Sequence, residues 1–138
     1  MAVNSEHIST VPILAKKFPG LKIVIDHFAK PNIKEKVFEP WATLMAEAAS
    51  FPNVYAKLSG LNTASAPDWT YADWQPYVDH IVKVYGANRV MLGGDWPVSI
   101  LAGDYVGVWK AQVDVIAHFT PEEQELIKSG VAKKFYNL

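Results

Sequence analysis

The chain has 138 residues, of which 50% are hydrophobic and 12% aromatic, and its formal net charge is −1. This composition is typical of a single globular domain, and the lack of a basic block argues against nucleic acid or an anionic membrane as a partner. Without cysteine, disulfides and thiolate metal sites are excluded, and the polar start MAVNSEHIST does not resemble a signal peptide, so we expect a cytoplasmic protein.

Short apolar runs alternate with longer amphipathic segments along the chain. The short runs are rich in β-branched and bulky apolar residues, which is typical of buried strands, and the longer segments have apolar residues at three- and four-residue spacing, which is typical of helices. In chain order, the predicted elements are helix 8–18, strand 22–28, helix 35–50, strand 54–60, helix 71–86, strand 89–95, helix 104–119 and helix 120–136.

Proline, glycine and threonine mark the ends of several predicted helices. Pro40 and Pro76 fall near the first turns of their helices, where a missing N–H is tolerated, and Gly86 marks a helix end. Thr120 is the expected N-cap of the last helix, with Pro121 at its first position. These residues therefore support the predicted boundaries.

The three predicted strands begin near residues 22, 54 and 89, so 32 and 35 residues separate their starts. This spacing accommodates one strand and one crossover helix, and it predicts an α/β fold with adjacent parallel strands and helices on one face. The other face would carry a shared apolar surface that requires a partner. We expect this surface to include Ile23, Ile25, Val54, Ala56 and Met91.

Polar side chains lie where these strands end. Since the carboxyl ends of parallel strands meet at one rim, His27, Lys57, Ser59 and Asp95 should project toward the same place. Each also has a structural interpretation. His27 could bind neighbouring loops, Lys57 could pair with Asp95, and Ser59 could belong to a turn.

Asp95 is the strongest candidate for chemistry. It follows Gly93 and Gly94, which let a ligand or another backbone approach closely. A carboxylate at the end of a buried strand is costly to desolvate unless it is paired or used. Trp96 follows directly and could line a pocket, and Pro97 prevents the strand from continuing.

The segments FPGLKIVIDHFAKP, FPNVYAKLSGLNT, NRVMLGGDWPV and AKKFYNL together resemble the C-terminal half of the amidohydrolase-2 family, in its sugar-lactonase branch. The resemblance implies that residues 1–138 form a single partial domain, the last three strands or so of a TIM-type (β/α)8 barrel. The chain departs from the family in having Gly93-Gly94 where Gly-Ser is usual, and Val131-Ala132 where Asn-Ala is usual. It also lacks the H-x-H pair of the family's first strand.

The resemblance implies hydrolysis of a sugar-derived lactone. Asp95 would activate the hydrolytic water and His27 would orient or polarise the substrate, while Lys57, Ser59 and Trp96 would line the pocket. His27 and Asp95 are too few for a catalytic zinc site, so we expect no cofactor, although a divalent metal is possible in the full-length parent.

A half-barrel of this kind should need a partner. Besides a small-molecule substrate, we expect a homo-oligomer or association with the missing half of the barrel, and no nucleic acid or membrane. Two alternatives stay open for the activity. The chain could belong to a metal-dependent decarboxylase of the same superfamily, or it could be an inactive half-barrel that assembles with a partner.

Overall fold

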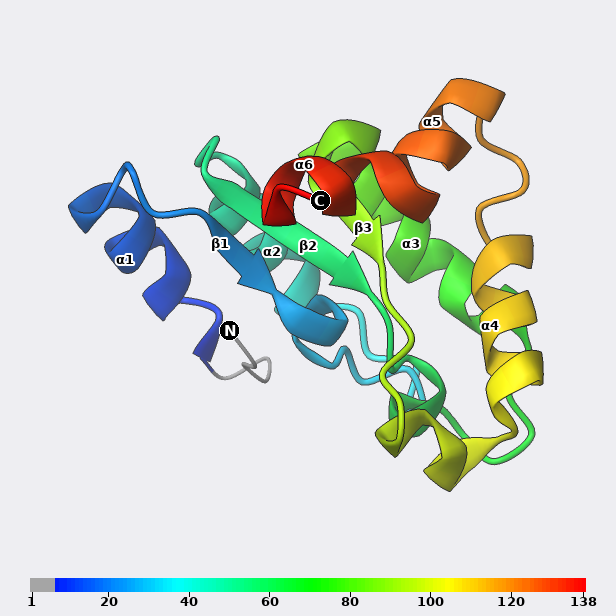
Figure 1. Cartoon of the computed structure of the whole chain (residues 1–138). Coiled ribbons are helices and arrows are strands. Elements are labelled where there is room, and N and C mark those ends of the chain that lie inside the picture. Colours follow the sequence, from blue (N-terminus) through cyan, green and yellow to red (C-terminus); the bar gives the residue numbers. More distant parts are fainter. Residues whose placement is uncertain (1–6) are drawn as a thin grey trace.

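A computed structural model describes residues 7–138 of the chain (Figure 1). Three short strands alternate with helices, and short helical turns follow the strands. The main elements are α1 (Thr10–Lys17), β1 (Ile23–Ile25), α2 (Trp41–Ala49), β2 (Val54–Leu58), α3 (Tyr71–Tyr85), β3 (Val90–Leu92), α4 (Tyr105–Asp114), α5 (Pro121–Glu125) and α6 (Val131–Tyr136). The predicted order of elements is confirmed.

The strands form one parallel sheet in the order β1-β2-β3. Ile23 aligns with Val54, and Ala56 aligns with Val90, so the strands are in register from one edge of the sheet to the other. All three strands are shorter than predicted. The residues that follow them in the predicted segments turn away from the sheet, and they include the candidate site.

One face of the sheet packs against α2 and α3, which lie behind the strands in Figure 1. Ile25, Val54, Ala56 and Leu58 are fully buried on this face, and Ile23 is 6% exposed. The expectation that Ile23, Ile25, Val54 and Ala56 form an exposed surface is therefore wrong. Because side chains alternate along a strand, the residues facing the helices could not also face away from them.

The opposite face carries Tyr55, Lys57 and Met91, and the C-terminal helix lies in front of it in Figure 1. The ring of Phe135 in α6 packs edge-on against Tyr55, with centroids 5.0 Å apart, and the ammonium of Lys57 lies 5.7 Å from the ring of Tyr136. Met91 is fully buried. The prediction of helices on one face only is therefore wrong, because the aromatic end of the chain folds back over the sheet.

The helix predicted over residues 35–50 begins only at Trp41, with Pro40 as its N-cap. Before it, Asn32 forms an isolated bridge with Val37, and Lys36 adopts a left-handed backbone with φ of 53°. This local bridge replaces the first turn of the expected helix.

The last two predicted helices are also divided. α4 ends at Asp114, so the end of the 104–119 segment forms turns, and a π-helical turn over Leu126–Gly130 separates α5 from α6. Thr120 caps α5 as predicted, since its hydroxyl accepts a hydrogen bond from the N–H of Glu123 at 3.2 Å.

The predicted C-terminal end of α3 is confirmed, since Gly86 stands there with φ of +74°. Pro76, however, lies in the second turn of α3 rather than the first. Within residues 7–138, no helix is both long and apolar enough to cross a membrane.

Candidate active site

The turn that follows β1 holds His27 in an uncommon backbone conformation. Four consecutive residues, His27 to Lys30, have φ values between 50° and 59°, in the left-handed region. This region costs non-glycine residues roughly 1–2 kcal/mol each. Tertiary contacts hold the turn, because Phe28 and Ala29 are fully buried and the Trp41 indole N–H donates to the carbonyl of Phe28 at 2.6 Å.

The ends of β2 and β3 bring two further groups to the same place. Ser59 directly follows β2 and is fully buried. Asp95 lies beyond β3, where the Gly93 N–H donates to the Leu58 carbonyl at 3.0 Å and so extends the pairing of the two strands. Asp95 also has a left-handed backbone, with φ of 49°.

His27, Ser59 and Asp95 form one cluster. The Nδ1 atom of His27 lies 2.8 Å from the hydroxyl oxygen of Ser59, and Nε2 lies 3.5 Å from Oδ1 of Asp95. The side chains of His27 and Asp95 are 22% and 10% exposed. The structure therefore brings together three of the five residues predicted for the site, from the ends of three different strands.

The carboxylate of Asp95 is incompletely satisfied. Its Oδ2 atom is buried and has no hydrogen-bond partner within the described part of the chain. A buried oxygen without a partner carries a desolvation penalty of about 1–3 kcal/mol, more when the group is charged. Such a group is uncommon in a native structure and calls for an explanation, of which a catalytic role is one.

Gly60 makes the close approach of these groups possible. Its φ is +62°, and a Cβ atom at this position would lie 2.5 Å from Oδ2 of Asp95 and 2.9 Å from Nδ1 of His27. Only glycine fits this backbone and this space. The sequence indicated only a turn at Ser59 and Gly60, although a glycine directly after a polar residue at a strand end was a usable signal for this close approach.

Burial lowers the pKa of His27 below its usual value, although attraction to the carboxylates of Asp95 and Asp26 opposes this effect. Desolvation disfavours the charged imidazolium, and the nearby negative charges only partly compensate. The ring therefore favours its neutral form, in which one nitrogen donates a hydrogen bond and the other accepts one.

Lys57 pairs with Asp26 rather than with Asp95, so the suggested ion pair with Asp95 is wrong. Its ammonium lies 2.7 Å from Oδ1 of Asp26, and both side chains are about one-fifth exposed. Burial lowers the pKa of Lys57, but hydrogen bonds to Asp26 and Tyr136 outweigh burial and leave this pKa above its usual value. Lys57 lies in β2 two residues before Ser59, but its ammonium contacts Asp26, at the start of the turn that holds His27.

Trp96 is 71% exposed, and the peptide bond between it and Pro97 is cis. The side chain of Trp96 is therefore not packed into the interior of this chain. A contact between Trp96 and a substrate remains a prediction.

Two buried amides stabilise the strand ends, and no sequence pattern indicated either. Gln112 of α4, with its amide nitrogen turned toward the sheet, donates to the carbonyls of Leu58 at 2.9 Å and Gly93 at 3.0 Å. The amide of Asn62 donates to the carbonyl of Ser99 at 2.7 Å, in the loop after β3. Gln112 thus joins α4 to the ends of β2 and β3, and Asn62 joins the turn after β2 to the loop after β3.

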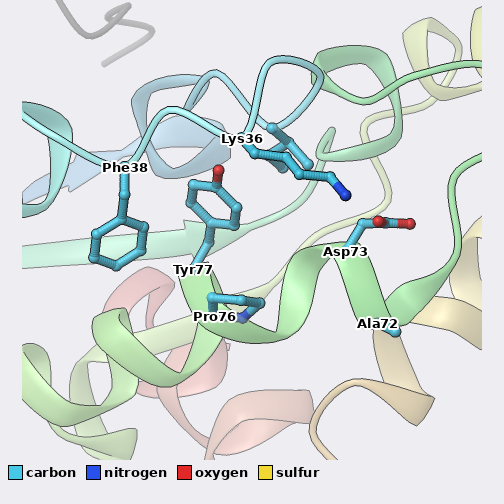
Figure 2. A pocket seen from close by; sticks show the side chains of 7 residues that line it. Lys36, Phe38, Ala72, Asp73, Pro76 and Tyr77 are labelled. Carbon is cyan, nitrogen blue, oxygen red and sulfur yellow. The ribbon is translucent and has the colours of Figure 1, made fainter.

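A cavity of about 340 Å³ lies elsewhere, between the segment before α2 and the start of α3 (Figure 2). Its lining includes Lys36 and Asp73, whose charged ends point toward each other in Figure 2, and the rings of Phe38 and Tyr77. None of the predicted site residues lines it. The candidate site is therefore the cluster at the strand ends and not this cavity.

The donor set for a metal ion is small. Within residues 7–138, no group of three or more histidine, cysteine, aspartate or glutamate side chains is arranged to hold a metal. In the cluster, Nδ1 of His27 already contacts Ser59, which leaves Nε2 and the Asp95 carboxylate. A catalytic zinc site usually has three protein ligands, so these two groups do not make one by themselves.

Comparison with known proteins gives a consistent result. The model of the amidohydrolase family matches residues 6–138. An L-fucono-1,5-lactonase from Burkholderia ambifaria is 37% identical over 140 residues, which cover 99% of this chain and 48% of that protein. An L-rhamnono-gamma-lactonase from Scheffersomyces stipitis is 28% identical over 105 residues, covering 62% of this chain and 30% of that protein.

The crystal structure of an amidohydrolase from Burkholderia multivorans with bound zinc matches the fold with a TM-score of 0.91. It is 25% identical, and the match covers 99% of this chain and 52% of that one. The chain thus spans about half of the solved structure and less than half of the two lactonases. The open three-stranded sheet corresponds to about half of a TIM barrel, as predicted.

Proposed function

The chain belongs to the amidohydrolase-2 family, and on that premise we propose that it provides the base and the histidine for hydrolysing a sugar-derived lactone. The observation that carries this proposal is the buried Asp95 carboxylate, one oxygen of which has no hydrogen-bond partner within residues 7–138. It lies beside His27, whose ring favours the neutral form. The L-fucono-1,5-lactonase relative indicates the substrate class, a cyclic ester of a sugar acid.

Asp95 is suited to general-base catalysis. Its carboxylate would take a proton from water while the water oxygen bonds to the lactone carbonyl carbon and the carbonyl π electrons move to oxygen. When this tetrahedral intermediate collapses, the bond from carbon to the ring oxygen breaks. Protonated Asp95 then returns its proton to the leaving ring oxygen, which gives the open hydroxy acid.

His27 would stabilise the negative charge that develops on the carbonyl oxygen. Its Nε2 atom faces the carboxylate of Asp95, and a hydrogen on this nitrogen can be donated to an oxyanion placed beside Asp95. Lys57 lies two residues before Ser59, and Trp96 directly follows Asp95. We propose that Lys57 contacts the hydroxyl groups of the sugar and that Trp96 contacts its ring face.

The zinc found in the Burkholderia multivorans relative raises the question of a metal. A divalent ion would supply Lewis-acid polarisation of the carbonyl if further ligands came from outside residues 7–138. The donor set of this chain does not fit such a site by itself, and the proton transfers proposed for Asp95 and His27 involve no metal.

Exposed apolar side chains in the segment that follows Asp95 support association with further protein. In the loop after β3 and in α4, the side chains of Trp96, Ile100, Leu101 and Val106 are each more than half exposed. Soluble monomers rarely expose such a set together. We therefore propose a homo-oligomer or a complex with a second half-barrel, and sedimentation velocity of the purified chain at several concentrations tests this.

Hydrolysis of L-fucono-1,5-lactone by the purified chain tests the proposed activity, with the spontaneous rate subtracted. We expect a rate above background that falls by about 10²–10⁴-fold in Asp95→Asn, because the amide keeps the shape of the carboxylate but cannot accept the proton. Asp68→Asn, an exposed carboxylate far along the chain from Asp95, is the matched control and should keep the full rate.

A folded wild-type chain without any rate above background, or an Asp95→Asn variant as fast as wild type, would contradict the proposal. The first result would favour the inactive half-barrel, for which the exposed apolar surface beside Trp96 is the supporting observation. The decarboxylase alternative predicts stoichiometric metal in elemental analysis of the purified protein and release of carbon dioxide from an aromatic carboxylate.

A further inference from the structure

We infer that Ser59 is a positioning residue that fixes the proton of His27 on Nε2, the nitrogen that faces Asp95. This inference rests on the proposed function for its catalytic meaning, but its structural claim concerns only the ring of His27. It assigns Ser59 a role different from the substrate contact expected from the sequence.

The surroundings of Ser59 make a direct contact with a ligand difficult. The residue has no exposed surface, and among residues 7–138 its hydroxyl has one side-chain partner, Nδ1 of His27, at 2.8 Å from Oγ. A serine hydroxyl has a single hydrogen to donate. Once that hydrogen is directed at His27, none is left for a substrate.

The direction of this hydrogen bond follows from the other side of the ring. A carboxylate oxygen of Asp95 lies 3.5 Å from Nε2, and an ionised carboxylate only accepts hydrogen bonds. In the neutral ring, the hydrogen is therefore best placed on Nε2. Nδ1 then carries the lone pair and accepts the hydrogen of the Ser59 hydroxyl.

The backbone prevents the ring from escaping this arrangement. His27 is held in a left-handed turn whose next two residues are fully buried, and Gly60 closes on the ring so tightly that a Cβ would lie 2.9 Å from Nδ1. A ring flip would place a carbon where Ser59 now finds an acceptor. Ser59 thus selects both the orientation of the ring and its tautomer.

The chemical consequence is a donor of fixed direction beside the base. With the hydrogen on Nε2, neutral His27 presents an N–H group on the side of Asp95, where the carbonyl oxygen of an ester or lactone would gain negative charge. With the hydrogen on Nδ1, the same position would present a lone pair to that oxygen and repel it. The tautomer therefore decides whether His27 helps or hinders the proposed reaction.

NMR of the ¹⁵N-labelled chain without substrate tests the inference, since correlations between ring carbon-bound hydrogens and ring nitrogens distinguish the two neutral tautomers. The signals of His27 are assigned by their loss in His27→Gln. At a pH where the ring is neutral, we expect a single Nε2–H tautomer. An Nδ1–H tautomer or an even mixture in the wild-type chain overturns the inference, whatever any variant does.

Ser59→Ala then tests the cause of the tautomer. We expect the shifts of the two ring nitrogens to move toward each other, as in a mixture of tautomers, because Nδ1 has lost its donor. Ser99→Ala is the matched control, since Ser99 is equally buried but its hydroxyl has no partner in the described residues. An unchanged Nε2–H signature in folded Ser59→Ala overturns the role of Ser59.

These outcomes are independent of the activity assay. A chain that hydrolyses no lactone can still show the Nε2–H tautomer and its dependence on Ser59. Conversely, an active chain with an Nδ1–H ring would keep lactone hydrolysis with Asp95 as the base, but it would refute this inference and the proposed oxyanion contact of His27.

Discussion

The helix-covered face of the sheet and the rim at its carboxyl ends are built from the same three strands, but they differ in polarity, in backbone conformation and in how completely their polar groups are paired. On the covered face, Ile25, Val54 and Ala56 are fully buried, apolar and within regular strands. At the rim, His27 and Asp95 have left-handed backbones, and one oxygen of Asp95 has no partner in the described part of the chain. The covered face is apolar and regular, whereas the rim combines a strained backbone with incompletely paired polar groups.

The groups at the rim lower the free energy of unfolding. Strained backbone and incompletely paired polar groups each cost on the order of 1–3 kcal/mol and persist only when the surrounding structure holds them in place. Here the burial of Phe28 and Ala29 and the close packing of Gly60 hold the rim. The covered face supplies the stability that offsets this cost, which is the pattern expected of a functional site on a rigid sheet.

The largest effect on stability should come from the covered face. Ile81 of α3 is fully buried in the core, and Ile81→Ala should lower the free energy of unfolding by about 2–5 kcal/mol because it leaves a cavity. Ile13→Ala, at a side chain 66% exposed, should change it by less than about 0.5 kcal/mol. Urea unfolding followed by circular dichroism measures both, and equal effects would remove the distinction between core and surface on which the comparison depends.

A smaller loss is expected at the rim from Gly60→Ala. The left-handed backbone alone should cost about 1–2 kcal/mol, and the new methyl group must displace the Asp95 carboxylate or the His27 ring. Gly20→Ala is the control, since nothing lies within 4 Å of a Cβ there, and it should be neutral or stabilising by up to about 1 kcal/mol. If both variants unfold at the same urea concentration, the result contradicts the close contacts of Gly60 with Asp95 and His27.

Asp95→Asn should act in the opposite direction and stabilise the fold by about 1 kcal/mol. A neutral amide is less costly to bury than a carboxylate with an unpartnered oxygen, and asparagine tolerates the left-handed backbone well. Exposed Asp68→Asn should change stability by less than about 0.5 kcal/mol. A clear destabilisation by Asp95→Asn would show that this carboxylate is structural rather than retained for chemistry.

The smallest expected effect is a pH dependence that involves His27. Because the pKa of the folded state lies below the ordinary value of 6.5, the unfolded chain binds more protons as the pH falls. The contribution of the neutral ring to stability is therefore complete above pH 6.5 and is lost as the pH falls through the lowered pKa. His27→Gln should flatten this part of the profile in thermal unfolding between about pH 7 and 5, and an identical slope in both proteins would contradict the burial of a neutral ring.

The elements that depend on local pattern could be predicted from the amino-acid sequence alone. The apolar runs and their spacing predicted three parallel strands in order, and Thr120 and Gly86 predicted two helix ends, because hydrophobic periodicity and capping act over a few residues. The meeting of His27, Ser59 and Asp95 was also predictable, since parallel strands bring their carboxyl ends to one rim.

The contacts that these residues make could not be predicted in this way, because they depend on how distant segments pack. Lys57 pairs with Asp26 instead of Asp95, and Gly60 packs closely against the cluster of His27, Ser59 and Asp95. α6 folds back over the sheet. No local sequence pattern predicts any of these contacts. These features depend on the positions of groups that are distant in sequence, and the left-handed turn at His27 opposes local preference altogether. Local propensity fixes which elements form, whereas the packing of distant side chains determines which strained and polar arrangements persist.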